Sequence, residues 1–351
     1  MSQNLDEVAP TLSIGAAAPK TPLILKLVRF REFAILFALI VVFAATSIKN
    51  TSFASSSSIQ GLLSGPAVII LIAVGETLVI ITRNVDLTVG SVLGLSAYLV
   101  GDLYVHYPHT PVIVALLFGT VVGAVCGVVT GVIVAYARVP SLAVTLGLLY
   151  IIRGVVAVIV NAVQINATSL PPGFINVGAN NFIGIPIMMW VAIVVVAVVG
   201  YAMRNFRAAR EMYAIGSNPE AAVLAGIRVQ RRIFSAFVAS GALAGLAGAL
   251  WLAEFATVGS TAGTGYELDA VAAAVVGGVA IFGGSGTVLG AALGALFLNT
   301  INQALVAAGV SSFWDEAVAG LLLVLAIAFD RYLIVRSERI LRVEGRERGR
   351  H

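Results

Sequence analysis

Residues 203–232 read MRNFRAAREMYAIGSNPEAAVLAGIRVQRR, and this polar stretch lies between two long apolar runs. Six arginines bracket its centre: Arg204, Arg207, Arg210, Arg228, Arg231 and Arg232. A loop with this much charge between apolar segments has to lie in water on one side of a membrane. The stretch is too short to be a domain, and its regular arrangement of arginines around a central segment is not typical of a linker. We therefore expect a docking element for a partner that supplies energy.

The composition of the 351-residue chain indicates a polytopic membrane protein. Hydrophobic residues make up 59% and charged residues only 11%, whereas soluble domains carry about 25% charged residues. The net charge of +4 does not suggest nucleic acid as a partner, because the basic residues lie between apolar runs. The single cysteine, Cys126, excludes an intrachain disulfide, and the three histidines lie in expected loops or the tail. No metal site is expected.

We predict an all-α transmembrane bundle of about ten segments, because a spanning helix needs about 20 apolar residues. The segments are 33–48, 62–82, 88–103, 111–136, 141–160, 186–203, 233–255, 268–281, 288–307 and 313–329. Those at 88–103 and 268–281 are short, and either is a span or a re-entrant helix. Residues 1–32 form an N-terminal segment, 33–330 the transmembrane domain with the loop 204–232, and 331–351 a basic tail expected to be helical.

Lysine and arginine predict the orientation of these segments. With the N-terminus in the cytoplasm, 19 of the 21 lysines and arginines fall on the inner side. Lys49 falls outside, and Arg153 lies within a span. This distribution predicts that both termini are cytoplasmic. The outer loop 161–185, with its turn Pro171-Pro172-Gly173, is expected to be an ordered cap.

Glycines recur every fourth residue in three rows. The rows are Gly119, Gly123, Gly127 and Gly131; Gly241 and Gly245; and Gly286, Gly290 and Gly294. Small residues at this spacing let helix backbones approach closely in lipid. We interpret the rows as packing surfaces and not as ligand sites.

Two polar breaks interrupt apolar segments. In the first, Glu76 lies within an apolar run and Asp86 stands before the next one, where a carboxylate can cap a helix. An ionisable residue in a span suggests function. The alternatives are that Asp86 is only a cap and that Glu76 only hydrogen-bonds between helices. In the second break, Glu267 precedes a short helix that ends at Gly283-Gly-Ser-Gly286. No Lys-[ST] pair follows, so we interpret these glycines as a tight turn.

The central loop contains a helix start at Asn218-Pro219-Glu220, with asparagine as the cap and proline at the first helical position. Residues 221–225 continue it until Gly226. Its alanine face suits insertion into a groove on another protein, and the alternative is a surface helix that lies on its own bundle. The sequence contains no phosphate-binding loop, so any ATP is bound by another subunit.

Three motifs occur in order along the chain. They are Asp86-Leu-Thr-Val-Gly-Ser91, Ala214-Ile-Gly-Ser-Asn-Pro-Glu-Ala-Ala222 with Gly226-Ile227, and Ala272-Ala-Ala-Val-Val-Gly-Gly278 with Gly283-Gly-Ser-Gly-Thr287. Together they resemble the permease subunits of bacterial ABC sugar importers of the ribose type, over about residues 30–330. The sequences of residues 76–86 and Phe313-Trp314 most resemble those of the rhamnose and autoinducer-2 branch. One departure is Ala208-Ala-Arg210, where the family usually has Phe-Gly-Arg.

The resemblance implies a transport subunit, not an enzyme, in the bacterial inner membrane. It implies a second permease (the same chain or a homologue), two ATP-binding subunits that carry ATP and Mg²⁺, and an extracytoplasmic sugar-binding protein. No cofactor is bound by this chain itself. The residues that it implies for coupling to the ATPase are Gly216, Asn218, Pro219, Glu220, Ala221, Ala222 and Gly226. The expected mechanism is alternating access, with the ATPase pushing the helix at Asn218.

The solute pathway is expected to carry polar residues on otherwise apolar elements, because sugar hydroxyls need directional hydrogen bonds. The candidates are Glu76, Asn84, Asp86, Glu254, Glu267, Asn299 and Asn302. The alternative is an ion-coupled secondary transporter, with Glu76 and Glu254 as relay carboxylates. A membrane-embedded enzyme is disfavoured by the lack of a His/Cys cluster, a catalytic Ser/Lys pair or a metal motif. A passive channel would conduct without nucleotide.

Overall fold

The computed structural model describes residues 23–161, 163–311, 314, 317–328 and 331. Residues 1–22 of the predicted N-terminal segment, Phe313, and residues 332–351 of the predicted tail lie outside the described residues. The described chain is almost entirely helical, as the composition and hydropathy predict. A short antiparallel hairpin, β1 (Asn181–Phe182) and β2 (Ile185–Pro186), and two 3-10 turns, η1 (Thr51–Ala54) and η2 (Ala167–Ser169), accompany the helices.

Eight helices in the described part of the chain are long and apolar enough to cross a membrane. They are α1 (Leu23–Lys49), α2 (Ser56–Ile81), α3 (Val89–His106), α4 (Val112–Ala135), α5 (Ser141–Val160), α7 (Ile187–Asn205), α10 (Val229–Phe255) and α12 (Val288–Ala307). The other two predicted segments correspond to shorter helices, α11 (Tyr266–Val276) and Ala317–Ala328. The predicted bundle is confirmed, with all ten segments helical.

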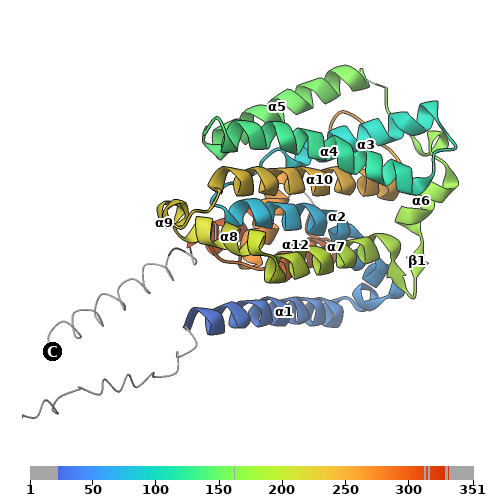
Figure 1. Ribbon diagram of the computed structural model, residues 1–351. Helices are drawn as coiled ribbons and strands as arrows, with labels where there is room; N and C mark the ends of the chain where they lie inside the picture. Colours follow the sequence, from blue (N-terminus) through green and yellow to red (C-terminus); the bar gives the residue numbers. More distant parts are fainter. Residues whose placement is uncertain (1–22, 162, 312–313, 315–316, 329–330, 332–351) are drawn as a thin grey trace, which may run out of the picture.

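The long helices lie side by side, and several shorter elements lie at the two ends of the bundle (Figure 1). At one end lie α8 (Arg207–Ser217) and α9 (Pro219–Leu224); we call this the α9 end. At the opposite end lie α6 (Pro172–Ala179) and the β1–β2 hairpin; we call this the α6 end. The predicted cap at 161–185 is therefore an ordered element whose helix begins at Pro172.

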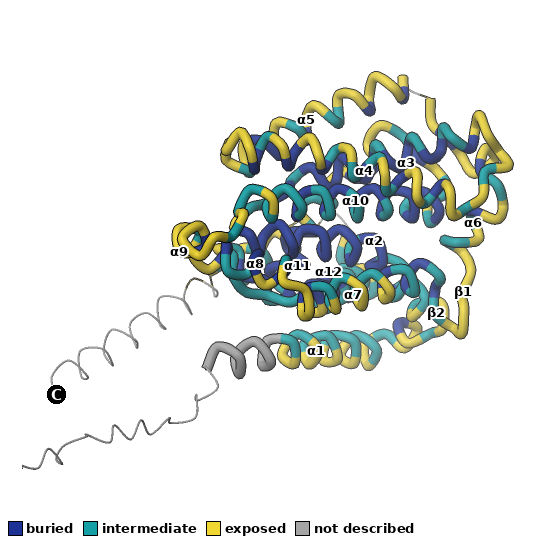
Figure 2. The backbone as a smooth tube through the Cα atoms, in the orientation of Figure 1, coloured by how far each residue is buried: buried dark blue, intermediate teal, exposed yellow. Residues whose placement is uncertain are grey.

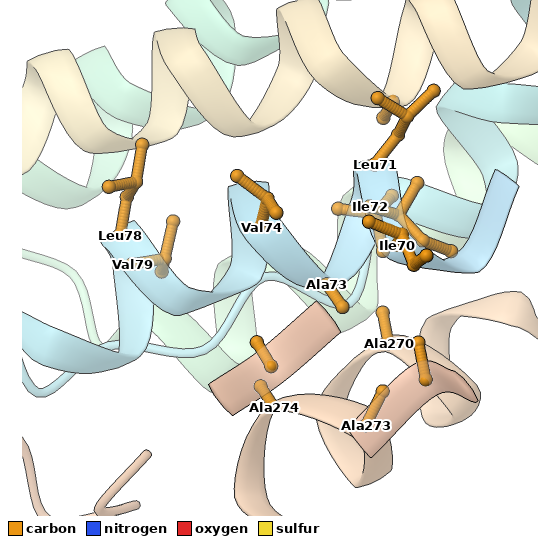
Figure 3. Packing of buried hydrophobic residues seen from close by; sticks show 14 of the residues in the cluster. Ile70, Leu71, Ile72, Ala73, Val74, Leu78, Val79, Ala270, Ala273 and Ala274 are labelled. Carbon is orange, nitrogen blue, oxygen red and sulfur yellow. The ribbon is translucent and has the colours of Figure 1, made fainter. Parts of the chain in front are cut away.

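Helix α2 forms the centre of the bundle. Almost every residue from Pro66 to Ile81 is buried, with α10 on one side and α11 on the other (Figures 2 and 3). Leu71, Val74 and Leu78 point toward one neighbouring helix, whereas Ala73 faces Ala270 of α11. A helix that is apolar on all sides is typical of a buried position. The helix starts at Ser56, before the predicted 62, because the hydroxyl of Ser55 caps it.

The glycine rows bring α4 against α10 backbone to backbone. A Cβ atom on Gly123 would lie 2.0 Å from the carbonyl oxygen of Gly241, and one on Gly245 would lie 2.1 Å from that of Gly119. Only glycine fits at such a distance. In the third row, a Cβ atom on Gly294 would lie 2.1 Å from the carbonyl oxygen of Ala273 in α11. The predicted packing role is confirmed for the rows on α4 and α10 and for Gly290 and Gly294, whereas Gly286 lies in the turn before α12, with a φ of 133°.

Helix α11 is too short to cross a membrane. Its 11 residues extend about 16 Å at 1.5 Å per residue, about half the thickness of the hydrocarbon core. The preceding segment, residues 256–265, returns into the bundle without regular structure, and the carbonyl oxygen of Ala262 lies against Gly94 of α3. Irregular backbone of this kind is tolerated where protein surrounds it. The short segment near 268–281 is therefore a broken helix.

Candidate functional site

Helix α8 is an amphipathic helix that sequence periodicity alone did not separate from the loop. Ala209, Met212 and Ile215 recur at helical spacing and are buried, while the arginines around them are exposed. Helix α9 follows after one residue, Asn218, whose side-chain oxygen accepts a hydrogen bond from the backbone N–H of Ala221 at 3.0 Å. The predicted start of this helix, with its asparagine cap and first-turn proline, is confirmed.

The C-terminus of α8 is clamped to the inner elements of the bundle. The guanidinium of Arg83, just after α2, donates to the carbonyl oxygens of Gly216 (2.5 Å) and Ser217 (2.8 Å). A Cβ atom on Gly216 would lie 1.9 Å from the carbonyl oxygen of Ile81 and 2.3 Å from the nitrogen of Gly284. Gly216 is therefore the point where α8, the end of α2 and the turn after α11 meet.

Two further contacts fasten α8. The carboxylate of Glu211 accepts from Arg232 of α10 at 2.6 Å and from Arg207 at 2.8 Å. The hydrogen bond from Arg232, with that from Arg207 and the charge of both, lowers the pKa of Glu211. The hydroxyl of Tyr213 donates to the carbonyl oxygen of Gly286 at 2.9 Å. A displacement of α8 thus reaches α10, α2 and the turn at 283–286 together.

Helix α9 offers a different face from the one expected. Ala222 is only 3% exposed and lies against the bundle, so it does not reach outward. Ala221 is exposed as expected, but the large outward apolar side chains of the helix are Val223, 61% exposed, and Leu224, 89% exposed. The positive φ of Gly226 (76°) ends α9 as predicted, because glycine adopts this conformation without strain. A partner that approaches α9 meets Val223 and Leu224 first.

Glu76 and Asp86 form a buried cluster at the break between α2 and α3. Neither side chain has exposed surface. Glu76 accepts from the backbone N–H of Asp86 at 3.1 Å. Asp86 accepts from the N–H of Thr88 at 3.0 Å, from its hydroxyl at 2.5 Å and from the hydroxyl of Ser240 at 3.0 Å. One oxygen of Glu76 is buried without a hydrogen-bond partner. Asp86 therefore joins α10 to the turn before α3. It is not the helix cap that was expected, because the N-cap residue of α3 is Thr88 and no side chain caps the helix.

A second charged pair lies on the other side of α3. The guanidinium of Arg153, on α5, lies 3.2 Å from the carboxylate of Glu267 in the first turn of α11. It also donates to the hydroxyl of Thr264 at 2.6 Å and to the carbonyl oxygen of Gly263 at 3.1 Å. Among the described residues, no three His, Cys, Asp or Glu side chains could hold a metal ion together.

A comparison with protein families identifies the chain. Residues 58–327 match the family model "Branched-chain amino acid transport system / permease component". The chain belongs to this permease family. It is a multi-pass inner-membrane permease, as the apolar helices and the resemblance predict.

The permease is similar to two curated proteins that carry the same name. The "Autoinducer 2 import system permease protein LsrC" of Escherichia coli (strain K12 / DH10B) is 33% identical over 314 residues, which are 89% of this chain and 90% of that protein. The protein of that name from Salmonella paratyphi B (strain ATCC BAA-1250 / SPB7) is 33% identical over 312 residues, which are 89% of each. No solved structure matches the chain significantly.

The seven pathway candidates lie in several parts of the permease. Glu76 and Asp86 are together, and Glu267 pairs with Arg153, as described above. Asn299 and Asn302 line a cavity of about 530 Å³ between η1, α2 and α12, into which Asn50 and Gln303 also project. Asn84 donates to the carbonyl oxygen of Thr82 at 2.9 Å in the α2–α3 break, and Glu254 is half-buried on the last turn of α10. The structure does not bring these seven residues together into one site.

The sequence reasoning missed three residues of these sites. Arg83, Ser240 and Arg153 were not nominated, although Arg153 was placed within a span. A charge in an apolar segment is itself a signal of function, so this residue could have been found. Ser240 gave no such signal, because serines are common in membrane helices and only the fold places this one beside Asp86.

Proposed function

We propose that this permease imports a sugar or a sugar-like small polar solute of the ribose, rhamnose and autoinducer-2 class. The substrate follows from the names of the similar proteins and from the motifs quoted above. Two separate ATP-binding subunits hydrolyse the ATP, and the permease moves solute by alternating access. A second permease, either a copy or a homologue, and an extracytoplasmic solute-binding protein complete the system.

One observation supports coupling at α9: one residue, Asn218, joins this helix to α8, which is fastened to the end of α2, to α10 and to the turn after α11. Leu224 is exposed, and three residues before the start of α9 the chain passes Gly216, where α8 touches both Ile81 and Gly284. A partner that pushes on α9 therefore moves the ends of α2 and α11 without an intervening flexible linker. This proposal places the α9 end and both termini in the cytoplasm, in accord with the excess of arginine there.

In this assembly the proposed coupling residues have two roles. Gly216, Asn218 and Gly226 shape the backbone, through a close contact, a helix cap and a left-handed turn. Pro219, Glu220 and Ala221 form the first turn of α9, and Ala222 holds it to the bundle. The contact with the ATPase falls to Val223 and Leu224. The proposed domains remain 1–32, 33–330 with the coupling loop 204–232, and 331–351.

Reconstitution of the full chain with the ATPase and solute-binding protein encoded beside it tests this function. Wild-type vesicles are expected to take up autoinducer-2 or L-rhamnose only with ATP inside. Uptake by the permease alone with an ion gradient would instead support a secondary transporter. Conservative replacement of each of the seven pathway candidates, with the same uptake measurement, tests that set; unchanged uptake in all seven variants would rule it out.

The variant Leu224→Glu tests the coupling surface. A charge at an exposed apolar contact is expected to lower uptake by about tenfold, the effect of losing one strong interface residue, while thermal unfolding stays unchanged. Val139→Glu is the matched control, because Val139 is also an exposed aliphatic residue, 39% accessible, in the connection after α4. Normal uptake by Leu224→Glu would refute a role of α9 in coupling.

A further inference from the structure

Arg153 is a cation on an otherwise apolar helix. It lies seven residues before the end of α5, about two helical turns inside the span. Its neighbours on α5 include Tyr150, Ile151 and Val158, which are 68%, 61% and 78% exposed (Figure 2). An arginine inside a membrane helix is costly to insert, so it needs a compensating environment.

The side chain finds that environment toward the protein. Its two terminal nitrogens contact Thr264, Gly263 and Glu267, which all belong to the irregular segment before α11 and the first turn of that helix. The arginine therefore holds the re-entrant segment, through three different acceptors.

Glu267 is held on its other side by α3. A Cβ atom on Gly90 would lie 2.0 Å from the Glu267 carboxylate and 2.6 Å from the carbonyl oxygen of Gly263. The carboxylate therefore lies directly on the first turn of α3, where the missing side chain of Gly90 leaves room. Arg153 and Glu267 remain 20% and 14% exposed, so this pair is not sealed within the bundle as Glu76 and Asp86 are.

The face of α5 beside this pair is open. A side chain added at Gly147 or Gly154 would meet no atom within 4 Å. Tyr150 lies between them, three residues after the first and four before the second, on the same face of the helix. A phenol, a guanidinium, a carboxylate and the hydroxyl of Thr264 thus border open space within the span. Such donors and acceptors suit a solute that is rich in hydroxyl groups.

We propose that Arg153, Thr264 and Glu267 form a hydrated polar constriction inside the membrane, where hydroxyl groups of the transported solute bind. Arg153 is then a solute-contacting residue, and α5 borders the aqueous pathway instead of lipid. This inference rests on the permease function proposed above and adds a location for its pathway. The ion pair closes the constriction when no solute is present, and solute hydroxyls take over hydrogen bonds of Arg153 and Glu267 during passage.

The first test asks whether water reaches this face, and it needs neither solute nor ATPase. In a full-length Cys126→Ala background, Gly154→Cys places a thiol beside Arg153, where it fits without a clash. Leu117→Cys is the matched control: Leu117 is 58% exposed on α4, five residues from the helix end, against six for Gly154. A charged, water-soluble methanethiosulfonate should label the thiol at 154 at least about tenfold faster, because thiolates form in water and not in lipid. Equal, slow labelling of both would refute the aqueous pathway.

The second test separates solute contact from a structural strut. Removing Arg153 alone leaves a buried carboxylate unpaired and is expected to lower membrane abundance, so the informative variant is the double Arg153→Met/Glu267→Met. Replacing both partners of an ion pair by apolar residues often preserves stability. We expect this variant to reach the membrane and unfold thermally as wild type does, while uptake falls about tenfold or more. Wild-type uptake by the double variant would show that the pair only supports the fold. If the wild-type protein itself shows no ATP-dependent uptake, the proposed function is refuted instead.

Discussion

The Nε atom of Arg83 lies 2.5 Å from the carbonyl oxygen of Gly216, a residue 133 positions later in the chain. Carbonyl groups in the last turn of a helix have no partner within it, so a cationic side chain is a favourable cap for α8. The arginine that caps α8 begins the break between α2 and α3, which also contains Asp86. Helix α8 and the buried carboxylates are thus linked through Arg83, which precedes Asp86 by three residues.

Arg83→Gln is expected to weaken this link by about 1 kcal/mol, the contribution of a charge-assisted hydrogen bond that is partly exposed. Transport should fall while ATP hydrolysis by the partner subunits continues. The ratio of solute uptake to ATP hydrolysis, with both rates measured on the same vesicles, tests this expectation. Arg138→Gln is the control, because Arg138 is also an arginine with positive φ in a helix connection. Equal behaviour of the two variants would contradict a specific role of Arg83.

Gly216→Ala should destabilise the permease. The added methyl group would lie 1.9 Å from the carbonyl oxygen of Ile81, and such overpacking costs about 1–3 kcal/mol. Gly200→Ala in α7 is the control: its methyl group meets no atom within 4 Å, and alanine is the better helix former by about 1 kcal/mol. Thermal unfolding in detergent should show a lower midpoint for the first variant only. A midpoint for Gly216→Ala at or above that of Gly200→Ala would contradict the close contact.

The two buried carboxylates should respond differently to substitution. Asp86→Ala removes the acceptor of three hydrogen bonds, from Thr88 and Ser240, and should cost about 1–3 kcal/mol. Glu76→Gln keeps an oxygen for the N–H of Asp86, and the other oxygen has no partner to lose. Its cost should stay below about 1 kcal/mol. Thermal unfolding compares them. Equal costs would contradict this difference in hydrogen bonding between the two carboxylates.

The tie between Glu211 and Arg232 should weaken in acid. The folded protein lowers the pKa of Glu211 from its ordinary value of 4.5. The ionised carboxylate therefore contributes stability above pH 4.5, and this contribution disappears as the pH falls through the lowered pKa. Glu211→Gln lacks the charge at every pH. The difference between the unfolding temperatures of the two proteins should be present at pH 7 and shrink below pH 4.5. A constant difference would contradict the ion pair.

The apolar runs predict where every long helix lies, because a spanning helix can be recognised from the length and hydropathy of its sequence. The glycine rows predict the packing surfaces but not that the row of α4 meets the row of α10. The helix at Asn218 was predicted from its cap and its proline. The expectation that Ala222 faces a partner was wrong, since the direction of a two-turn helix depends on where α8 ends. That end is set by Arg83 and Gly284, which are far away in sequence.

The pathway residues were the least predictable part. A polar residue in an apolar run indicates that some partner offsets the cost of its burial. The sequence does not show whether that partner is another buried side chain or water. Glu76 contacts Asp86, whereas Glu267 pairs with Arg153, an arginine within the span of α5. Distinguishing these two situations requires the relative rotation of the helices, which a single sequence does not contain.

The contact of α4 with α10 leaves no space for a side chain, so these two helices cannot slide past each other without separating. Helix α10 follows α9 after four residues. In the proposed mechanism, a force on α9 should therefore move α10 and α4 together as one rigid unit. Engineered disulfides that join α4 to α10 should therefore leave transport intact. Disulfides that join α5 to the segment 256–265 should stop transport. The two sets of disulfides would thus show which helices must move relative to each other during transport.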